Sequence, residues 1–121
     1  MVSALFDTNI LIDYLNGIER AKTELNRYSD KAISLITWME VMVGATPETE
    51  QIMRGFLSGF VNLPIEEQVS NVAITLRKKH KIKLPDAIMW ATAQVNRRIL
   101  VTRNTKDFPQ DEPGIRIPYQ I

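Results

Sequence analysis

The stretch Val2-Ser3-Ala4-Leu5-Phe6-Asp7-Thr8-Asn9 decides the fold class of this chain. Its apolar start, closed by a polar turn, indicates a short strand buried in the interior of the protein. Apolar residues then recur at helical spacing from Ile10 to Leu15, and Gly17 can end that helix. A buried strand that leads directly into a helix is typical of α/β proteins.

The same alternation of strand-like and helix-like segments continues along the sequence. Further strands are expected at 32–36, 61–63, 99–101 and 115–117. Helices are expected at 21–28, from Thr37, from Thr46, from Ile65 into the basic run 77–81, and from Pro85. This alternation favours a parallel sheet covered on both faces. We predict a single α/β domain over residues 1–121, with three layers (α/β/α) and a central, mostly parallel sheet of four to five strands.

Local signals make specific predictions about helix ends and faces. Thr37 is a natural N-cap, and Thr37 with Glu40 has the spacing of a capping box. Thr46, followed by a proline, is expected to begin the next helix in the same way. In the helix at 21–28, Leu25 and Tyr28 are expected to point inward. The charged side chains of the same helix are expected to point outward, and they are Lys22, Glu24 and Arg27.

Composition limits the chemistry that the chain can perform. It has 121 residues and no cysteine, and His80 is its single histidine. Disulfides, thiolate metal sites and a cysteine nucleophile are therefore excluded, and a zinc site, which needs more nitrogen or sulfur ligands, is not expected. A serine hydrolase would depend on His80, whose position inside a basic run disfavours the protonated imidazole.

The hydropathy of the chain argues against a membrane partner, and its net charge argues against a general attraction to nucleic acid. No stretch approaches the roughly 20 apolar residues of a membrane span, and the apolar start at 2–6 is too short for a secretory signal. We therefore expect a cytoplasmic protein without a membrane partner. The net charge of +1 gives no overall attraction to nucleic acid, so any surface that binds it must be local.

Four acidic residues lie where an apolar run ends or a helix begins, and they are Asp7, Glu40, Asp86 and Asp107. Each alone has a local explanation as a cap, a capping-box partner, a first-turn acid or a turn residue. Together they are expected at one edge of the sheet, where the carboxyl ends of parallel strands meet. Gathering several carboxylates is costly unless a cation offsets their charge. Without histidine or cysteine nearby, the pattern predicts a hard cation and metal-assisted phosphodiester chemistry.

These acids belong to four ordered motifs that span essentially the whole chain. The motifs are Asp-Thr-Asn-Ile-Leu-Ile-Asp-Tyr-Leu at 7–15, Ser-Leu-Ile-Thr-Trp-Met-Glu-Val at 34–41, Leu-Pro-Asp-Ala-Ile-Met-Trp-Ala-Thr-Ala at 84–93 and Leu-Val-Thr-Arg-Asn-Thr-Lys-Asp-Phe at 100–108. The set resembles the motifs of PIN-domain ribonucleases, in particular the VapC toxins of VapBC toxin–antitoxin pairs. Four ordered motifs are far more specific than any one of them. The resemblance implies a PIN-like fold.

The resemblance also implies an activity and its residues. A VapC-like chain would be a Mg²⁺- or Mn²⁺-dependent endoribonuclease that acts as a toxin, hydrolysing tRNA or rRNA and so inhibiting translation. Asp7, Asp86 and Glu40 match the family's first three acids and would hold the metal. Many PIN domains have an aspartate where this chain has Asn104, so either Asn104 or Asp107 would complete the catalytic set. Hydrogen bonds that orient these carboxylates would come from Thr8, Asn9 and Thr102.

The basic run that precedes the third motif is a candidate RNA-binding surface, formed by Arg77, Lys78, Lys79 and Lys81. It would lie along one rim of the acidic cleft and attract the phosphate backbone. A solvated helix end whose cations complement the helix dipole explains the run equally well. Arg103, inside the fourth motif, is a further candidate for a phosphate contact, as are Arg97 and Arg98.

Two protein partners follow from the resemblance. PIN toxins commonly form homodimers, and a VapB-type antitoxin typically places its tail in a hydrophobic groove of the toxin. An apolar stripe fits such a groove, although packing in the core explains the same stripe more simply. The stripe consists of Ile52, Met53, Phe56, Leu57 and Phe60, with Trp38 and Met42 beside it.

Other functions stay open from the sequence. A stand-alone PIN ribonuclease of RNA processing would have the same site without an antitoxin. A degenerate PIN fold that only binds would fit Asn104 in place of an acid, although the first three acids are retained. Phosphoryl-transfer receivers and haloacid-dehalogenase-like phosphatases also place aspartates at strand ends. They need a second acid where this chain has Asn9, or a lysine after a late strand, and neither is present here.

Overall fold

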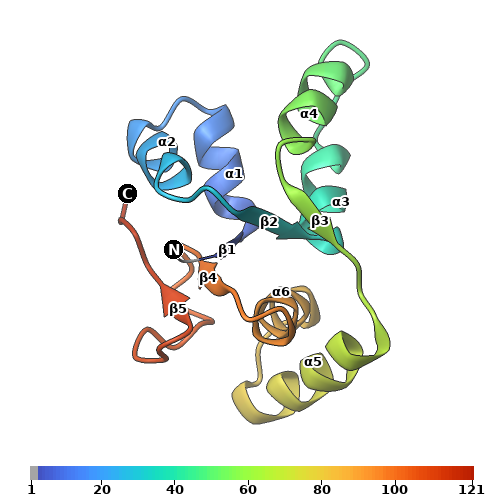
Figure 1. The fold of residues 1–121 in the computed structure, drawn as a ribbon, viewed down its shortest axis with the longest axis vertical. Helices are drawn as coiled ribbons and strands as arrows, with labels where there is room; N and C mark the ends of the chain where they lie inside the picture. The colour runs from blue at the N-terminus through green and yellow to red at the C-terminus, as the bar shows by residue number, and fades with distance from the viewer. Residues whose placement is uncertain (1–2) are drawn as a thin grey trace.

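The centre of the protein is a five-stranded, all-parallel β-sheet (Figure 1). The computed structural model describes residues 3–121, so Val2 of the predicted first strand lies outside the described residues. The strands are β1 (Ala4–Phe6), β2 (Lys31–Ser34), β3 (Val61–Leu63), β4 (Ile99–Val101) and β5 (Ile115–Arg116). They lie in the order β3-β2-β1-β4-β5, which confirms the predicted parallel sheet.

Helices cover both faces of this sheet, as the alternation of segments predicted (Figure 1). They are α1 (Thr8–Leu15), α2 (Glu19–Asn26), α3 (Leu35–Val43), α4 (Glu50–Leu57), α5 (Glu67–His80) and α6 (Leu84–Val95). Helices α1 to α4 lie on one side, and α5 and α6 lie on the other. Within residues 3–121, no helix is long and apolar enough to cross a membrane.

Strand β1 supplies side chains to both cores of this three-layer fold. Ala4 and Phe6 pack with apolar residues of α1 to α4, whereas Leu5 packs with residues of α5 and α6. Neighbouring residues of a strand point to opposite faces, so a strand buried on both sides must be apolar throughout. All three residues of β1 are fully buried, and this requirement explains the uninterrupted apolar run that opens the sequence.

The strand order places the carboxyl ends of β1 and β4 side by side. Phe6 of β1 lies opposite Val101 of β4, although the two strands are far apart in the sequence. The strand order reverses at this pair, since the chain moves outward to β2 and β3 on one side and to β4 and β5 on the other. A crevice opens at such a point, outside the carboxyl ends of the strands. Asp7 and Thr102, which follow β1 and β4, are thereby brought together.

The start of α3 corrects the prediction made for Glu40. Helix α3 begins at Leu35, and the hydroxyl of Ser34 caps it by accepting the backbone N–H of Thr37 at 3.2 Å. The capping box of Thr37 with Glu40 is therefore wrong, because both residues lie inside the helix. The predicted strand 32–36 is also two residues too long at its end, since β2 stops at Ser34. Ser34 takes the cap because its backbone is still extended where the strand ends.

Helix α4 begins later than predicted. Thr46 was expected to open it, but Thr49 occupies the N-cap position and Glu50 is the first helical residue. The hydroxyl of Thr49 accepts the backbone N–H of Thr46 at 2.8 Å. This bond closes a turn over residues 46–49 and delays the helix by one turn.

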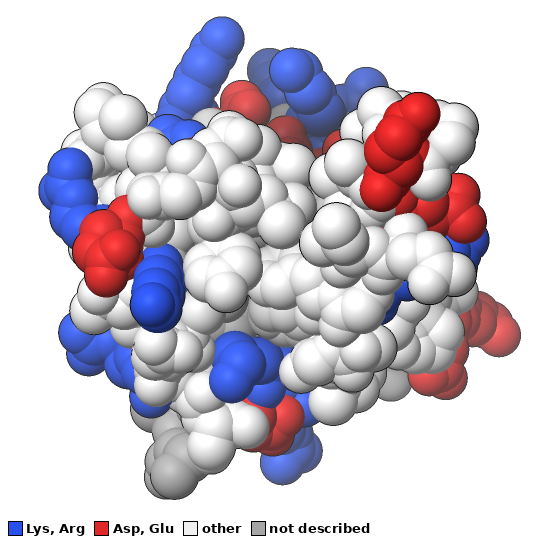
Figure 2. All heavy atoms as spheres, turned by 90° about the horizontal axis from the view of Figure 1, so that it is seen from above, with Lys and Arg blue, Asp and Glu red and all other residues white. Residues whose placement is uncertain are grey.

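The apolar stripe on and around α4 is divided between core and surface. Leu57 and Phe60 are buried, while Ile52 is 70% exposed. Four residues are partly buried against the core, namely Met53, Phe56, Trp38 and Met42. Seen from above, the side formed by α1 to α4 has a central region without charged side chains (Figure 2). The stripe therefore packs the core with one edge and leaves apolar surface at the other.

Glu24 of α2 points inward, contrary to the outward orientation predicted. Its carboxylate accepts two bonds from Arg116, at 2.7 and 3.0 Å, and one from the hydroxyl of Tyr28 at 2.9 Å. Arg116 lies in β5, so the helical pattern of α2 could not reveal this partner. The other predicted orientations are confirmed, with buried Leu25 and Tyr28 and exposed Lys22 and Arg27, but α2 spans Glu19–Asn26 rather than 21–28, so Tyr28 lies just beyond it.

Candidate active site

A cleft of about 410 Å³ lies at the crevice beyond β1 and β4. Its walls come from α1, α3, α6 and the loop that follows β4. The residues that line it are Asp7, Thr8, Asn9, Ile12, Asp13, Glu40, Asp86, Met89, Arg103 and Asn104. Asp7, Glu40, Asp86 and Asn104, which the sequence marked as candidates, thus come together from four separate motifs.

Asp7 is a buried carboxylate, 4% exposed, held by neutral donors. It occupies the N-cap position of α1, yet its side chain makes no capping bond. Its Oδ2 instead accepts the hydroxyl of Thr102 at 2.7 Å and the amide of Asn9 at 3.1 Å. Burial raises the pKa of Asp7 from 3.8 to about 6; the bond from Thr102 opposes this rise, and the negative charges of Asp86 and Glu40 add to it.

Thr8 links Asp7 to Glu40. The backbone N–H of Thr8 hydrogen-bonds Asp7, and its hydroxyl donates to Glu40 Oε1 at 2.6 Å. Glu40 is exposed on α3, one turn after the fully buried Thr37. Because Ser34 rather than Thr37 caps α3, the carboxylate of Glu40 is directed across to α1 instead of back to its own helix. Thr8 and Asn9 therefore have the orienting contacts that the sequence predicted for them.

Asp86 stands in the first turn of α6, where Pro85 fixes the start of the helix. Its pKa is raised, chiefly because it is partly buried and because the negative charge of Asp107 lies nearby. Lys83 opposes this rise, whereas Glu40 and a hydrogen bond with Asp107 add to it. Asp86 is thus the second acid of the cleft whose ionised form is disfavoured by burial and by the surrounding acids.

The loop after β4 gives Asn104 and Asp107 different tasks. Thr102 accepts the backbone N–H of Asn104 at 3.0 Å, which fixes the start of the loop beside Asp7. The amide oxygen of Asn104 accepts the backbone N–H of Asp107 at 3.1 Å, and its nitrogen donates to Asp107 Oδ2 at 3.0 Å. Asn104 therefore holds Asp107 in place, and Asp107 is the carboxylate that faces Asp86.

The acidic side chains of the cleft carry the kind of donor atom that a hard divalent cation prefers. The three carboxylates that line the cleft, Asp7, Glu40 and Asp86, offer oxygen atoms, which Mg²⁺ prefers as ligands. Among residues 3–121, no group of three or more Asp, Glu, His or Cys side chains already has the spacing of a metal cage. Mg²⁺ keeps several waters and takes one or two carboxylates, so it needs no closed cage. A cation would also offset the buried negative charge and the repulsion that together raise the pKa of Asp7 and of Asp86.

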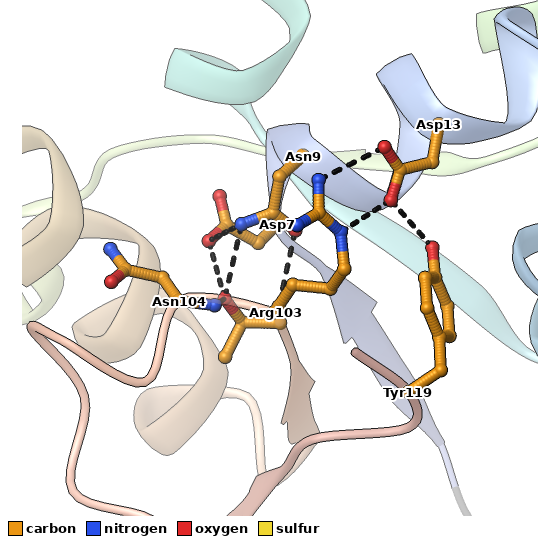
Figure 3. A network of polar contacts seen from close by, with 7 residues as sticks. Asp7, Asn9, Asp13, Arg103, Asn104 and Tyr119 are labelled. Carbon is orange, nitrogen blue, oxygen red and sulfur yellow. Dashed lines mark hydrogen bonds and ion pairs between the residues drawn. The ribbon is translucent and has the colours of Figure 1, made fainter. Parts of the chain in front are cut away.

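The sequence did not identify Asp13 and Tyr119 as part of this region. Asp13 lies one helical turn after Asn9, and both contact Arg103 (Figure 3). Arg103 forms an ion pair with Asp13, which raises the pKa of the guanidinium, and the hydroxyl of Tyr119 donates to the same carboxylate at 2.8 Å. The spacing of Asn9 and Asp13 could have shown that they share a face of α1. Nothing local to Tyr119 points to its role.

The basic run at 77–81 does not line the acidic cleft. Arg77, Lys78 and Lys81 line a separate hollow of about 380 Å³ with Ile74 and Leu84. Lys79 is exposed on the same helix. Arg77 also donates to the carbonyl of Ile82 at 2.7 Å and so closes the end of α5. RNA binding by this run stays a prediction.

Arg98 is engaged away from the acidic cleft. It forms an ion pair with Asp30 at 2.9 Å and donates to the carbonyl of Ala4 at 3.3 Å. Ala4 starts β1 and Arg98 directly precedes β4, so this contact lies at the amino-terminal edge of the sheet. The edge that carries Asp7 is the opposite one, and Arg98 is thus placed to stabilise the sheet rather than to face the acids.

Comparison with known protein families defines the class of this fold and site. The family model described as "PIN domain" matches residues 4–110. The chain therefore belongs to the PIN-domain family, as its four motifs predicted.

Solved structures place it nearer to one branch of that family. A chain in a toxin–antitoxin complex from Klebsiella pneumoniae is 52% identical with a TM-score of 0.93, and the match covers 98% of this chain and 100% of that chain. A chain of the DNA-bound VapBC complex from Salmonella typhimurium is 26% identical with a TM-score of 0.79, covering 97% of both chains. A chain of VapBC2 from Rickettsia felis is 22% identical with a TM-score of 0.74, and the match covers 95% of this chain and 96% of that chain. At this identity the likeness shows the fold alone. A search of curated proteins gave no match. The chain is similar to PIN toxins of the VapC type.

Proposed function

We propose that this protein is a Mg²⁺- or Mn²⁺-dependent endoribonuclease that acts as the toxin of a toxin–antitoxin pair. The observation that carries the proposal is the surroundings of Asp7, a buried acid whose pKa is raised to about 6 by burial and by the acids Asp86 and Glu40. Such an arrangement is unfavourable in the protein alone and becomes favourable when a cation binds. Membership of the PIN family supports the same reading.

Asp7 and Asp86 would hold the metal, with Glu40 as a third ligand or as the group that places the attacking water. The metal, when bound, would polarise the scissile phosphate and make a bound water a better nucleophile. Thr102 and Asn9 fix the orientation of Asp7, and Thr8 fixes that of Glu40. Asn104 keeps Asp107 beside Asp86. Hydrolysis would leave a 5′-phosphate and a 3′-hydroxyl without a covalent intermediate.

The biological setting of this activity is part of the proposal. We infer that the substrate is tRNA or rRNA in the cytoplasm, and that its cleavage inhibits translation. The domain over residues 1–121 would act as a homodimer and be neutralised by a VapB-type antitoxin. The similar chain from Klebsiella pneumoniae comes from a toxin–antitoxin complex, which supports such a partner. Val43 of α3 and Ile52 of α4 are exposed and offer apolar surface for it.

Cleavage of structured RNA by the purified protein, with Mg²⁺ or Mn²⁺ added, tests the proposed activity. We expect cleavage by the wild type, and a loss of at least about 100-fold in Asp7→Ala and in Asp86→Ala, because each removes a metal ligand. Glu19→Ala is the matched control, since Glu19 is an exposed acid in α2 that does not line the cleft. A wild-type protein that is inactive with both ions, or acid variants as active as the control, would refute the proposal.

A further inference from the structure

Arg103 is the one positively charged side chain among the described residues that line the acidic cleft. Asp13 holds its guanidinium through two bonds, from Nε to Oδ2 at 2.5 Å and from Nη2 to Oδ1 at 3.0 Å. The hydroxyl of Tyr119 also donates to Asp13 Oδ2. Both oxygens of Asp13 are therefore engaged by Arg103 and Tyr119, although Asp13 lines the same cleft.

The backbone of Arg103 is fixed by the same helix. Its N–H donates to Asn9 Oδ1 at 3.3 Å, and Asn9 lies one turn before Asp13 on α1. One face of α1 thus holds the main chain of Arg103 through Asn9 and the side chain through Asp13 (Figure 3). A flexible arginine normally loses much rotamer freedom when it binds a ligand. Here that freedom is already lost in the free protein.

The geometry leaves one part of the guanidinium for a ligand. Nη1 of Arg103 donates to no group within residues 3–121, and it is turned away from Asp13 (Figure 3). The side chain is 27% exposed, so an incoming anion can reach it. An anion that enters beside Asp7, Glu40 and Asp86 meets repulsion from three acids, and a fixed guanidinium offsets part of it.

We propose that Asp13 and Tyr119 are positioning residues, which hold Arg103 so that Nη1 binds a phosphate of the RNA backbone at the acidic cleft. The inference rests on the proposed RNA-cleaving function. It gives the cleft a built-in cation of its own, separate from the basic run at Arg77 to Lys81. It also makes Tyr119, near the end of the chain, part of substrate binding although it does not line the cleft.

Binding of a short, fluorescently labelled single-stranded RNA in the presence of EDTA measures this contact without cleavage. Arg103→Ala is expected to weaken binding about tenfold and to reduce the slope of log affinity against log salt concentration by about one, because one phosphate contact is lost. A loss of packing alone would leave the salt slope unchanged. Thermal unfolding of each variant shows whether it is folded.

Asp13→Asn and Tyr119→Phe test the positioning role. Each is expected to weaken RNA binding about threefold to tenfold, and neither should weaken it further in the Arg103→Ala background, because both act through that side chain. Tyr28→Phe is the matched control, since it removes a tyrosine bond to a buried acid, Glu24, outside the cleft. RNA affinity should be unchanged in this control.

If Arg103→Ala does not fold, Arg103→Lys replaces it: lysine keeps the charge but cannot make both bonds to Asp13, so affinity should fall while the salt slope is kept. An unchanged salt slope in Arg103→Ala, or equal losses from Asp13→Asn in both backgrounds, would overturn the inference while wild-type cleavage still supports the nuclease. If the wild type binds RNA and Arg103→Ala shows the expected change in slope, but the wild type cleaves no RNA, only the proposed function is contradicted. A wild type that binds no RNA overturns both.

Discussion

Two carboxylates of this protein, Asp7 and Glu24, are equally buried at 4% exposure and have opposite surroundings. Burial favours the neutral form of Glu24, but the bonds from Arg116 and Tyr28 outweigh it and lower its pKa. Asp7 accepts bonds only from neutral groups, and burial with the nearby acids raises its pKa to about 6. The two residues thus lie on opposite sides of the ordinary carboxyl pKa.

The difference separates a structural acid from the acid that we propose as a metal ligand. Glu24 joins α2 to β5 through a guanidinium, and this pair needs no further ligand. Asp7 is left with a charge that the protein itself does not neutralise, and such perturbed acids gather at functional sites. Burial alone therefore says little about the role of an acid, whereas the charge of its neighbours says much.

The largest expected effect is on activity. Asp7→Asn should reduce the rate of RNA cleavage at least about 100-fold. Glu24→Gln is the matched isosteric change at the structural acid, and its cleavage rate per folded molecule should stay within about threefold of wild type. Initial rates of cleavage with Mn²⁺, normalised to the folded fraction, measure both. Equal losses in the two variants would remove the distinction between the acids.

The second effect is on stability and has the opposite pattern. Glu24→Gln should lower the free energy of unfolding by about 2 kcal/mol, because it leaves Arg116 without its anionic partner. The figure is below that of a fully buried pair, since the side chain of Arg116 is 34% exposed. Urea unfolding monitored by circular dichroism gives the value. A change under about 0.5 kcal/mol would show that the pair contributes little.

The third effect depends on pH. Between about pH 4 and pH 6, Asp7 stays protonated in the folded protein but loses its proton in the unfolded chain. The contribution of Asp7 to the free energy of unfolding therefore falls as pH rises. Above about pH 6 the ionised, buried acid costs on the order of 3 kcal/mol. Asp7→Asn should therefore be more stable than wild type at pH 7.5 and equal to it near pH 4. Mn²⁺ should raise the melting temperature of wild type alone at pH 7.5.

Unfolding of both proteins across this pH range measures the difference directly. Cleavage should also decline as pH falls below about 6, because protonated Asp7 is a poor metal ligand. A stability difference that does not vary with pH would mean that the pKa of Asp7 is not raised.

The smallest effect concerns the support of Asp7. Thr102→Val removes the hydroxyl that donates to Asp7 and accepts the N–H of Asn104, and it should weaken Mn²⁺ binding about tenfold. Thr92→Val is the control, because Thr92 is equally buried but donates to the carbonyl of Ile88 within α6. Titration calorimetry compares the two. Equal Mn²⁺ affinity in both variants would deny Thr102 an orienting role.

Predictions from the sequence succeeded where the signal was local or belonged to a motif. The apolar run before Asp7 and the helical spacing after it gave a parallel α/β sheet, because a strand buried on both faces must be apolar throughout. The same logic placed Asp7, Glu40 and Asp86 at one edge, and the structure brings them into one cleft. The capping box at Thr37 failed because two hydroxyl residues compete for one helix end, and Ser34 takes it.

By itself, then, the sequence determined the fold class, the family and the acids that meet beyond β1, since all of these follow from periodicity and ordered motifs. Only the tertiary structure decided which acids are neutralised. Glu24 meets Arg116 and Asp13 meets Arg103 across separations of 92 and 90 residues, and Asp7 meets no cation among the described residues. Local spacing carries no information about such partners, because they are set by which strands and helices pack together. The balance of burial and charge that raises the pKa of Asp7 and lowers that of Glu24 is thus a property of the folded chain.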